Sequence, residues 1–519
     1  MGVEKDALTA QKPVQNRVKL VPPDGGWGWF ILIGTALSNI FNQSMLSLFS
    51  LLYGGALEEM GHQTKGAALV LSTMLFVTNF GGPIAAVLIK MTSTRFVAVS
   101  GACSCTLGIF LSGFSTNIWH LVFSYGFLLG LGLGFIQNSS FVAINSYFTS
   151  RKSRAVGLAN VGTGVGQTLM PHVVGYLLNT YCFRGACLIL AGLSLHGIAG
   201  TMLIQPVERH MKKIVEVVPV DEKLALLNGN NDADVKTKTA KEVTISHTRR
   251  ATEPAVGNQK ADLPKSYSYK ELMEKDGDAE KDSKVITNGD SGTNSNAQNQ
   301  KPGIFKKLYI LFDFSLLTSP RFLNIIIGTA LSVTSIQNFS MLFPLFLKNF
   351  VVVEMEEIAT CMSVIAGADI VGRLVLPVFQ DKFKIKARWM LIMTCIWLIV
   401  ARQILAYQKS LMAIIVMSAL YGFGRSMIIV ARNIAISENC KMEQVPAAVG
   451  LGMLAMGIIV PPAGFFLGWI RDYTQSYIIC ITAQNALLVI LLIFWIPDML
   501  YLHYEERKQK RKELEDIQI

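Results

Sequence analysis

Charged side chains are scarce in this chain. Asp, Glu, Lys and Arg make up 16% of its 519 residues, whereas hydrophobic residues make up 51%. A soluble domain usually carries about 25% charged residues. The composition therefore argues against a soluble protein and favours one that is embedded in lipid.

Motifs that would indicate catalysis or metal binding are also missing. The sequence holds no phosphate-binding P-loop, no nucleophile elbow and no metal motif. Its eight cysteines have neither the spacing of a disulfide framework nor that of a metal site. We therefore expect no enzyme, no ATP-driven pump, no bound metal and no cofactor. The N-terminus lacks the apolar core of a cleaved signal peptide, so the first apolar segment should itself direct insertion.

What the chain has instead is twelve apolar segments, in two groups of six. A membrane-spanning helix needs roughly 20 apolar residues, and helices keep their backbone groups paired where lipid offers no partner. The approximate bounds are 30–52, 66–90, 96–115, 118–148, 155–180 and 183–205, then 322–347, 356–380, 388–407, 411–436, 446–470 and 477–500.

This layout resembles the major facilitator superfamily, in which a long loop joins two six-helix bundles. We therefore predict an all-α membrane protein with that fold. Its predicted parts are a cytosolic N-terminal tail (1–23), a first bundle (24–206), a largely disordered cytosolic central loop (207–318), a second bundle (319–500) and a cytosolic C-terminal tail (501–519).

Positive charge predicts the orientation. Lys and Arg gather in the N-terminal tail, the central loop and the segments 382–388 and 507–512, whereas the opposite loops carry isolated charges such as Lys65 and Lys409. The positive-inside rule then places both termini in the cytosol. The distribution of Lys and Arg over the cytosolic segments therefore accounts for the net charge of +11. We expect no nucleic-acid partner, because no folded basic domain is visible.

The hexapeptide Asp24-Gly25-Gly26-Trp27-Gly28-Trp29 stands directly before the first apolar segment. Its glycines permit a tight backbone entry, and its tryptophans suit the headgroup level. Trp27 and Trp29 alone would fit an ordinary aromatic belt. The whole hexapeptide resembles the signature that opens the first membrane helix of the monocarboxylate transporter family.

A second segment supports the same resemblance. Tyr147-Phe148 is followed by a basic cluster that includes Arg154, and then by Ala155-Val156-Gly157-Leu158-Ala159. This pattern is similar to the loop and fifth-helix signature of monocarboxylate transporters, and the resemblance extends over 22–206 and 320–500. The basic cluster either anchors the cytosolic ends of two helices or forms part of an inner gate.

Asp369 and Arg373 lie near the middle of the eighth apolar segment, four residues apart on one helix face. Ionisable groups at this depth usually face a water-filled path or a partner. The resemblance implies that Arg373 binds a substrate carboxylate and that Asp369 takes part in proton coupling. The alternative is a structural pair whose charges neutralise each other.

Arg425 and Asn138 complete the predicted site. Arg425 lies midway along the tenth segment, and by depth it could reach the same cavity. It would then either add positive charge that an anionic substrate neutralises, or hold Asp369 and leave Arg373 free. Asn138 falls where the family has a substrate-cavity asparagine, although buried amides also bond across helices. By position, Arg432 should reach toward the cytosolic headgroups and Arg402 lies near the outer end of its helix.

One departure from the family concerns the first helix. Proton-coupled lactate carriers have a lysine where this chain has Ser47. The two signatures and the charged residues predict a secondary transporter of small monocarboxylates such as lactate or pyruvate. Because the lysine is missing, proton coupling is left open. The alternatives are a facilitator for an aromatic amino acid, carnitine, creatine or a thyroid-hormone-like solute, and a membrane sensor that transports nothing.

The expected partners follow from the predicted transport function and from the family resemblance. They are a small organic anion, the lipid bilayer and, by resemblance, a single-span immunoglobulin-type ancillary protein. Glu222–Leu227 and Tyr269–Leu272 resemble endocytic signals that bind trafficking adaptors. We expect residence in the plasma membrane, with the endosomal membrane as the alternative.

Overall fold

The computed structural model describes residues 14–61, 64–219 and 312–518. The two segments that resemble endocytic signals, and most of the central loop, lie outside the described residues. The chain divides into two compact units, one of Pro22–His210 with Ile286–Ile519 and one of Met1–Val21 with Met211–Val285.

The smaller unit contains a two-stranded antiparallel ribbon. Strand β1 (Val14–Val21) pairs with β2 (Lys212–Pro219), with Val14 opposite Pro219 and Val21 opposite Lys212. Both strands are rich in valine, and β2 adds Ile214; these β-branched residues favour extended backbone. The sequence was expected to form only tail and loop here, so the ribbon is an addition to the predicted helical fold.

The first half of the larger unit is helical. The first segment is divided into α1 (Trp27–Ser38), the π-helical turn η1 (Asn39–Gln43) and α2 (Met45–Glu59). The others are α3 (Thr64–Met91), α4 (Thr94–Ser112), α5 (Ile118–Leu121) continued by the π-helical η2 (Val122–Leu129) and α6 (Gly130–Tyr147), and finally α7 (Lys152–Met202). Cys182 breaks α7 into two helices with a φ of 55°.

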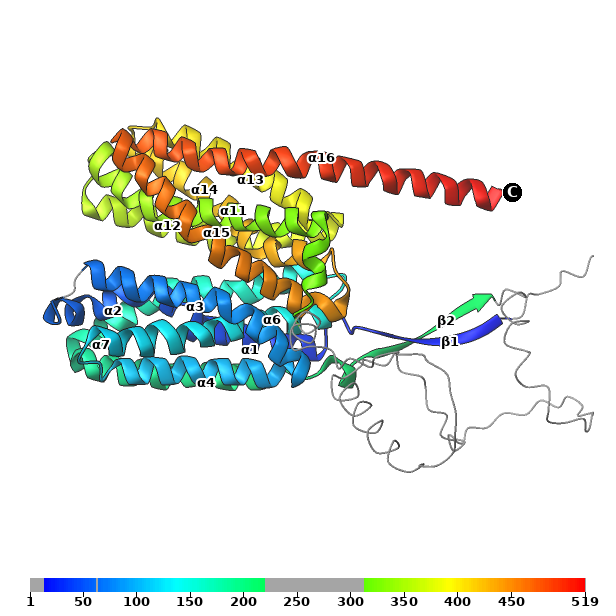
Figure 1. The fold of residues 1–519 in the computed structure, drawn as a ribbon, viewed down its shortest axis with the longest axis horizontal. Helices are drawn as coiled ribbons and strands as arrows, with labels where there is room; N and C mark the ends of the chain where they lie inside the picture. Colours follow the sequence, from blue (N-terminus) through cyan, green and yellow to red (C-terminus); the bar gives the residue numbers. More distant parts are fainter. Residues whose placement is uncertain (1–13, 62–63, 220–311, 519) are drawn as a thin grey trace, which may run out of the picture. The chain divides into compact units, whose positions relative to one another are not determined.

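The second half repeats this organisation (Figure 1). Its main helices are α11 (Pro320–Phe346), α12 (Met355–Phe383), α13 (Ala387–Ala406), α14 (Leu411–Ser437), α15 (Val445–Thr474) and α16 (Tyr477–Gln518). Short turns adjoin them at η5 (Phe314–Thr318), η6 (Leu347–Val351) and η7 (Met442–Gln444), and η3 (Val207–Arg209) follows α7. The sequence predicted an end near residue 500, but α16 continues through a tail of helix-favouring Glu, Lys and Arg.

Ten described helices are long and apolar enough to cross a membrane. One of them, α7, holds two spans, and the interrupted segment from α1 to α2 supplies another. The described part of the chain therefore contains the twelve expected spans. Large side chains such as Phe465, Phe466 and Trp469 are more than half exposed, as expected of surfaces that face lipid and not water. These observations confirm an all-α membrane protein of two six-helix groups.

Small residues bring helices into close contact within each group. A Cβ atom on Gly34 would collide with the carbonyl of Gly200, so α1 packs directly on α7. In the second group, a Cβ on Gly422 of α14 would collide with the carbonyl of Ile365 in α12. Close backbone approach of this kind is the usual basis of helix association in membranes.

Several contacts join the two groups at the end where α3, α6, α12 and α14 terminate. Asn145 of α6 donates to Met442 Sδ at 3.1 Å, and Lys90 of α3 forms an ion pair with Asp313. Asp381, near the end of α12, accepts hydrogen bonds from the first turn of α7. We call this end, where the chain also enters α1, the gate end of the bundles.

Candidate anion-binding site

Asp369 and Arg373 form a buried ion pair in the middle of α12. Both residues are only 2% exposed, and Arg373 Nη2 lies 2.5 Å from Asp369 Oδ2. Their spacing of four residues places them one above the other on the helix. A charge pair this deep in a bundle is costly to bury, so it needs further partners to be satisfied.

Arg373 also reaches the other bundle. Its Nη1 donates a hydrogen bond of 2.6 Å to the backbone carbonyl of Asn160 in α7. The approach depends on glycine, because a Cβ on Gly157 would lie 2.6 Å from the carbonyl oxygen of Arg373, and one on Gly164 would lie 2.7 Å from Ile370 Cγ1. Gly157, a residue of the fifth-helix signature, thus allows α7 and α12 to meet at the predicted substrate arginine.

Arg425 of α14 lies on the other side of Asp369. Its Nε is 3.9 Å from Asp369 Oδ1, and its side chain is 21% exposed. Helices α12 and α14 come together where a Cβ on Gly372 would collide with Ser426 Oγ. Of the two arrangements considered from the sequence, Arg373 is the close partner of Asp369 in this structure and Arg425 is the looser one.

Two atoms of this cluster remain unsatisfied. Asp369 Oδ1 and Arg373 Nε are buried, and neither has a hydrogen-bond partner among the described residues. The group therefore keeps unused hydrogen-bonding capacity that a bound molecule or a change of conformation can use.

Arg432 is half-buried in the last third of α14. Its Nε is buried without a hydrogen-bond partner in the described part of the chain, and its Nη1 contacts Met456 Sδ of α15 at 3.5 Å. Packing between α14 and α15 therefore covers one side of the guanidinium, and the expected reach toward the headgroups stays a prediction.

Asn138 lies in a different contact between the bundles. It is fully buried on α6, and its Nδ2 donates to the carbonyl of Gly82 in α3 at 2.8 Å and to that of Pro446 in α15 at 3.3 Å. Its Oδ1 has no hydrogen-bond partner among the described residues. The structure brings Asp369, Arg373 and Arg425 together, while Asn138 joins α3, α6 and α15.

The hexapeptide signature binds the loop that carries the second signature. Asp24 Oδ1 accepts hydrogen bonds from the backbone N–H groups of Thr149 at 2.6 Å and Ser150 at 3.0 Å, and Oδ2 accepts one from Thr149 Oγ1 at 2.7 Å. Burial raises the pKa of this carboxyl, but the hydrogen bonds from Thr149 and Ser150 outweigh burial and hold the pKa below its usual range.

The aromatic residues of the two signatures complete this contact. Trp29 meets Phe148 edge to face at 5.7 Å, and Trp27 Nε1 donates to the carbonyl of Leu203 at 3.1 Å. Tyr147 donates its hydroxyl to the carbonyl of Gln205 at 3.2 Å. Gly26 adopts a φ of 57° just before α1, a conformation that favours glycine. Trp27 and Trp29 therefore do more than form an aromatic belt, since they fix the ends of three segments.

Arg154 marks a contact of α7 with the second bundle. The backbone N–H groups of Ser153 and Arg154 donate to Asp381 at 3.2 Å and 2.9 Å, and Arg154 Nε lies 3.5 Å from the same carboxylate. A carboxylate at a helix N-terminus is favoured by the helix dipole. This contact joins α7 to α12 across the bundles, and the two roles considered for the basic cluster, anchor and inner gate, both stay predictions. No motif in the sequence pointed to Asp381 as the partner of this helix end.

Arg402 is a second buried cation. Its position near the end of α13 had not suggested that it would be buried. It is 0% exposed and donates to Ser335 Oγ at 2.9 Å and to the carbonyl of Ser335 at 3.3 Å. Its guanidinium lies 5.4 Å from the ring of Phe339 and 6.0 Å from that of Tyr421. Hydrogen bonds and cation–π contacts thus satisfy Arg402 within the second bundle.

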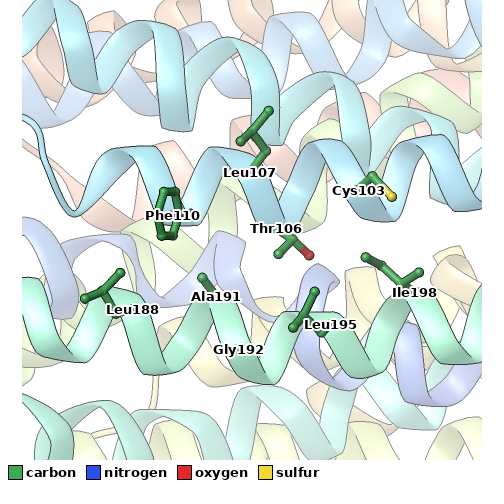
Figure 2. Close-up of a pocket in the computed structure, with 9 residues that line it drawn as sticks. All are labelled: Cys103, Thr106, Leu107, Phe110, Leu188, Ala191, Gly192, Leu195 and Ile198. Carbon is green, nitrogen blue, oxygen red and sulfur yellow. The ribbon is translucent and has the colours of Figure 1, made fainter.

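An apolar pocket elsewhere does not suit a charged solute. It has a volume of about 370 Å³ and lies between α4 and the second part of α7 (Figure 2). Its lining is Cys103, Thr106, Leu107, Phe110, Leu188, Ala191, Gly192, Leu195 and Ile198. The Thr106 hydroxyl already interacts with the Ala102 carbonyl and with Ser194 Oγ. The buried arginines therefore remain the candidate site for an anion.

Comparison with known proteins identifies the class. Residues 31–273 and 286–516 match the family model of the Major Facilitator Superfamily, so the chain belongs to that superfamily. It is a multi-pass membrane transporter and not an enzyme. The structure of the human organic anion transporter MFSD10 (TETRAN) superimposes with a TM-score of 0.55 at 12% identity, over 92% of this chain and 100% of that one. At this identity the likeness concerns the fold alone.

Individual relatives agree with the two signatures. The chain is 31% identical to Monocarboxylate transporter 13 of Rattus norvegicus over 185 residues, which is 36% of this chain and 43% of the relative. It is 33% identical to Monocarboxylate transporter 2 of Homo sapiens over 186 residues, or 36% and 39% of the two chains. The matches span about two fifths of each relative. They confirm the resemblance to monocarboxylate transporters, and nothing in them supports the alternative of a sensor.

Proposed function

We propose that this transporter carries a small organic anion across the membrane by alternating access and that Arg373 holds the carboxylate of its substrate. The observation that carries the proposal is the buried pair of Asp369 and Arg373 at the contact between the bundles. The similarity to monocarboxylate transporters supports a carboxylate substrate of the lactate or pyruvate type.

Substrate binding would exchange one anion for another on Arg373. A guanidinium presents a planar fork that matches a carboxylate, and here Asp369 and the Asn160 carbonyl occupy that fork. An incoming carboxylate competes with both. Asp369 then either moves toward Arg425, which is already 3.9 Å from Oδ1, or takes up a proton.

The same exchange would couple binding to movement of the bundles. The hydrogen bond from Arg373 to Asn160 joins α12 to α7, so its loss weakens one connection between the two halves. Substrates of such transporters bind between the two bundles, which rock about the site. Release of Arg373 from Asn160 is thus a direct way for the substrate to favour a new arrangement.

A second candidate is a facilitator that needs no proton, for an aromatic amino acid, carnitine, creatine or a thyroid-hormone-like solute. Ser47 favours it, because the family lysine of the first helix is missing. The side chain of Ser47 lies outside the described residues. Asp369 remains the candidate for exchanging a proton, the one coupling ion that we propose.

The cellular setting is part of the proposal. We place both termini in the cytosol and the protein in the plasma membrane, with the endosomal membrane as the alternative. A single-span immunoglobulin-type protein is the candidate ancillary partner, and trafficking adaptors are candidates for the central loop.

Uptake of radiolabelled lactate and pyruvate into expressing cells, at acidic and at neutral outside pH, tests this function. We expect uptake that Arg373→Ala abolishes while surface expression persists, and stimulation by acid if Asp369 carries a proton. Uptake without acid stimulation would favour the facilitator. Unchanged uptake in Arg373→Ala would contradict the role given to Arg373.

A further inference from the structure

A hollow of about 220 Å³ lies at the gate end of the second bundle, between the turn that joins α12 to α13 and the later part of α16. The turn and the start of α13 contribute Lys384, Lys386 and Trp389 to its lining, and α16 contributes Met499, Leu502 and Glu506. The hollow includes none of the residues of the candidate anion-binding site. The proposed function therefore leaves it without a role.

The hollow stands at the level of lipid headgroups. Trp389 belongs to its lining, and Tyr501 is exposed beside Leu502 on α16. Tryptophan and tyrosine are enriched where a membrane meets water. Along α16, the exposed residues change from apolar ones such as Phe494 to basic ones such as Arg507. This change marks the edge of the bilayer, and the predicted orientation makes it the cytosolic edge.

The lining carries more positive than negative charge. Lys386 of the turn forms an ion pair with Glu506 of α16, and both side chains are about half exposed. Lys384 lies in the same hollow and has no ion-pair partner among the described residues. Two lysines therefore share one carboxylate.

The residues behind the lining are balanced in charge. Arg388 Nη2 lies 2.6 Å from Asp498 Oδ2, and Arg321 Nε lies 3.6 Å from the other oxygen of this carboxylate. Glu438 accepts a hydrogen bond of 3.0 Å from the backbone N–H of Ala387, next to Arg388. Two arginines thus lie among two carboxylates. The excess positive charge belongs to the hollow itself, where a ligand can reach it.

The backbone of Lys384 adds an independent observation. Lys384 ends α12 in the left-handed conformation, with a φ of 51°. Glycine is the usual residue at such a helix end, because a side chain makes this conformation less favourable. A lysine that is kept at a position favouring glycine indicates a use for its side chain.

The chemistry of the lining defines the ligand. Lysines bind phosphate as point charges, and basic pockets between helices at the cytosolic surface of a membrane suit lipid headgroups. Trp389, Met499 and Leu502 offer apolar surface beside the two lysines. A free phosphate ion would leave that surface uncovered. A zwitterionic lipid would bring a cation of its own next to Lys384.

We propose that this hollow binds an anionic phospholipid of the surrounding membrane, with its phosphate between Lys384 and Lys386 and the start of an acyl chain against Trp389 and Leu502. The phosphate takes the place of Glu506 on Lys386, so the lipid releases α16 from the turn. The site goes beyond the proposed function and does not depend on the identity of the substrate.

Native mass spectrometry of the purified full-length protein in detergent tests the proposal. The protein is titrated with phosphatidylglycerol and, separately, with phosphatidylcholine that has the same acyl chains. We expect the first molecule of phosphatidylglycerol to bind about fivefold or more tightly than phosphatidylcholine, because a net negative headgroup gains the attraction of a lysine without a partner. Glycerol 3-phosphate, which has no acyl chain, should not displace the bound lipid at the same concentration.

Variants identify the residues responsible. Lys384→Gln and Lys386→Gln should each reduce the affinity for phosphatidylglycerol about fivefold. Glu506→Gln should raise that affinity about twofold or more, because the phosphate no longer competes with a carboxylate for Lys386. Lys382→Gln is the matched control, since it removes the same charge from an exposed side chain two residues earlier that is not part of the lining. It should change the affinity less than about twofold.

Three results would overturn the inference. The first is equal affinity for the two lipids, or a preference that survives when Lys384 and Lys386 are both replaced by glutamine. The second is an equal loss in Lys382→Gln, which would assign the preference to general attraction by the cytosolic charges. The third is displacement by glycerol 3-phosphate, which would make soluble phosphate the ligand. None of them concerns carboxylate uptake, so the proposed function is tested separately.

Discussion

Arg373 makes contacts on two sides, with Asp369 on its own helix and with Asn160 on the facing bundle. Lysine at this position would keep the positive charge but would lose the fork. We expect Arg373→Lys to reduce carboxylate uptake by about tenfold or more, because a point charge cannot replace a bidentate contact. Uptake is measured relative to the surface protein, with Lys409→Gln as the matched control.

Asp369 is the one carboxylate at the described cluster, and Asn has nearly the same shape without an ionisable proton. If Asp369 carries the proton, Asp369→Asn removes acid stimulation of uptake while the protein still reaches the surface. The measurement is uptake across a series of outside pH values. Equal acid stimulation in Asp369→Asn and in the unmodified protein would assign proton coupling elsewhere.

Single residues also show what sequence reasoning can and cannot find in the site. Depth within an apolar segment was enough to bring Asp369, Arg373 and Arg425 together. The contact with Asn160 was not predicted. It uses the backbone carbonyl, which every residue type has, so the side chain gives no indication of it. The contact of Arg432 with Met456 depends on packing between two helices, and one sequence does not specify that packing.

Helix ends at the gate end are held by carboxylates, and Asp24 is the first of them. Its hydrogen bonds to Thr149 and Ser150 favour the charged form and lower its pKa. Its contribution is therefore present above the pKa of the unfolded chain and is lost as pH falls through the lowered folded pKa. We expect Asp24→Asn to cost about 1 kcal/mol at neutral pH, a value reduced by solvent screening.

Melting temperatures of the purified protein over a pH series check this expectation. The difference between Asp24→Asn and the unmodified protein should shrink as pH falls below about 4, where the carboxyl of the unfolded chain becomes protonated. It should vanish once the pH is low enough to protonate the carboxyl of the folded protein as well. A difference that stays constant over the series would show that the charge of Asp24 does not hold the loop.

Asp381 joins the two bundles at the gate end by accepting hydrogen bonds from the first turn of α7. Asp381→Ala removes that acceptor, so we expect the bundles to separate there more often. Distances between spin labels on Arg151→Cys and Lys384→Cys, in a background without other reactive cysteines, measure the change. The variant should show a larger long-distance population, and an unaltered distribution would mean that other contacts keep this end closed.

The elements themselves were largely predictable, because each apolar run had to form a helix in lipid. Most helix ends lie within a few residues of the expected positions. The interruption of the first helix is an exception. The π-helical turn η1 surrounds Asn42, whose Oδ1 accepts a hydrogen bond from Ser194 at 2.6 Å. That contact depends on a helix more than a hundred residues away, so the nearby sequence could not reveal it.

The two bundles contribute different groups to the candidate site. In the described residues, the charges at mid-helix depth lie in the second bundle, and the first contributes glycines and the Asn160 carbonyl. Under the proposed function, a carboxylate bound to Arg373 would break the hydrogen bond to Asn160 and so weaken the contact between the bundles. The orientation in the membrane, with both termini in the cytosol, stays a prediction that rests on the distribution of Lys and Arg.

Uptake by purified protein in proteoliposomes tests the central claim most directly, because no other carrier is present. Radiolabelled lactate, pyruvate and succinate are offered to vesicles that contain either the unmodified protein or Arg373→Ala, with equal folded protein verified in both. We predict uptake of at least one of these carboxylates by the unmodified protein and none above empty vesicles by Arg373→Ala. Equal uptake by the two proteins would contradict the assignment of Arg373 as the carboxylate-binding residue.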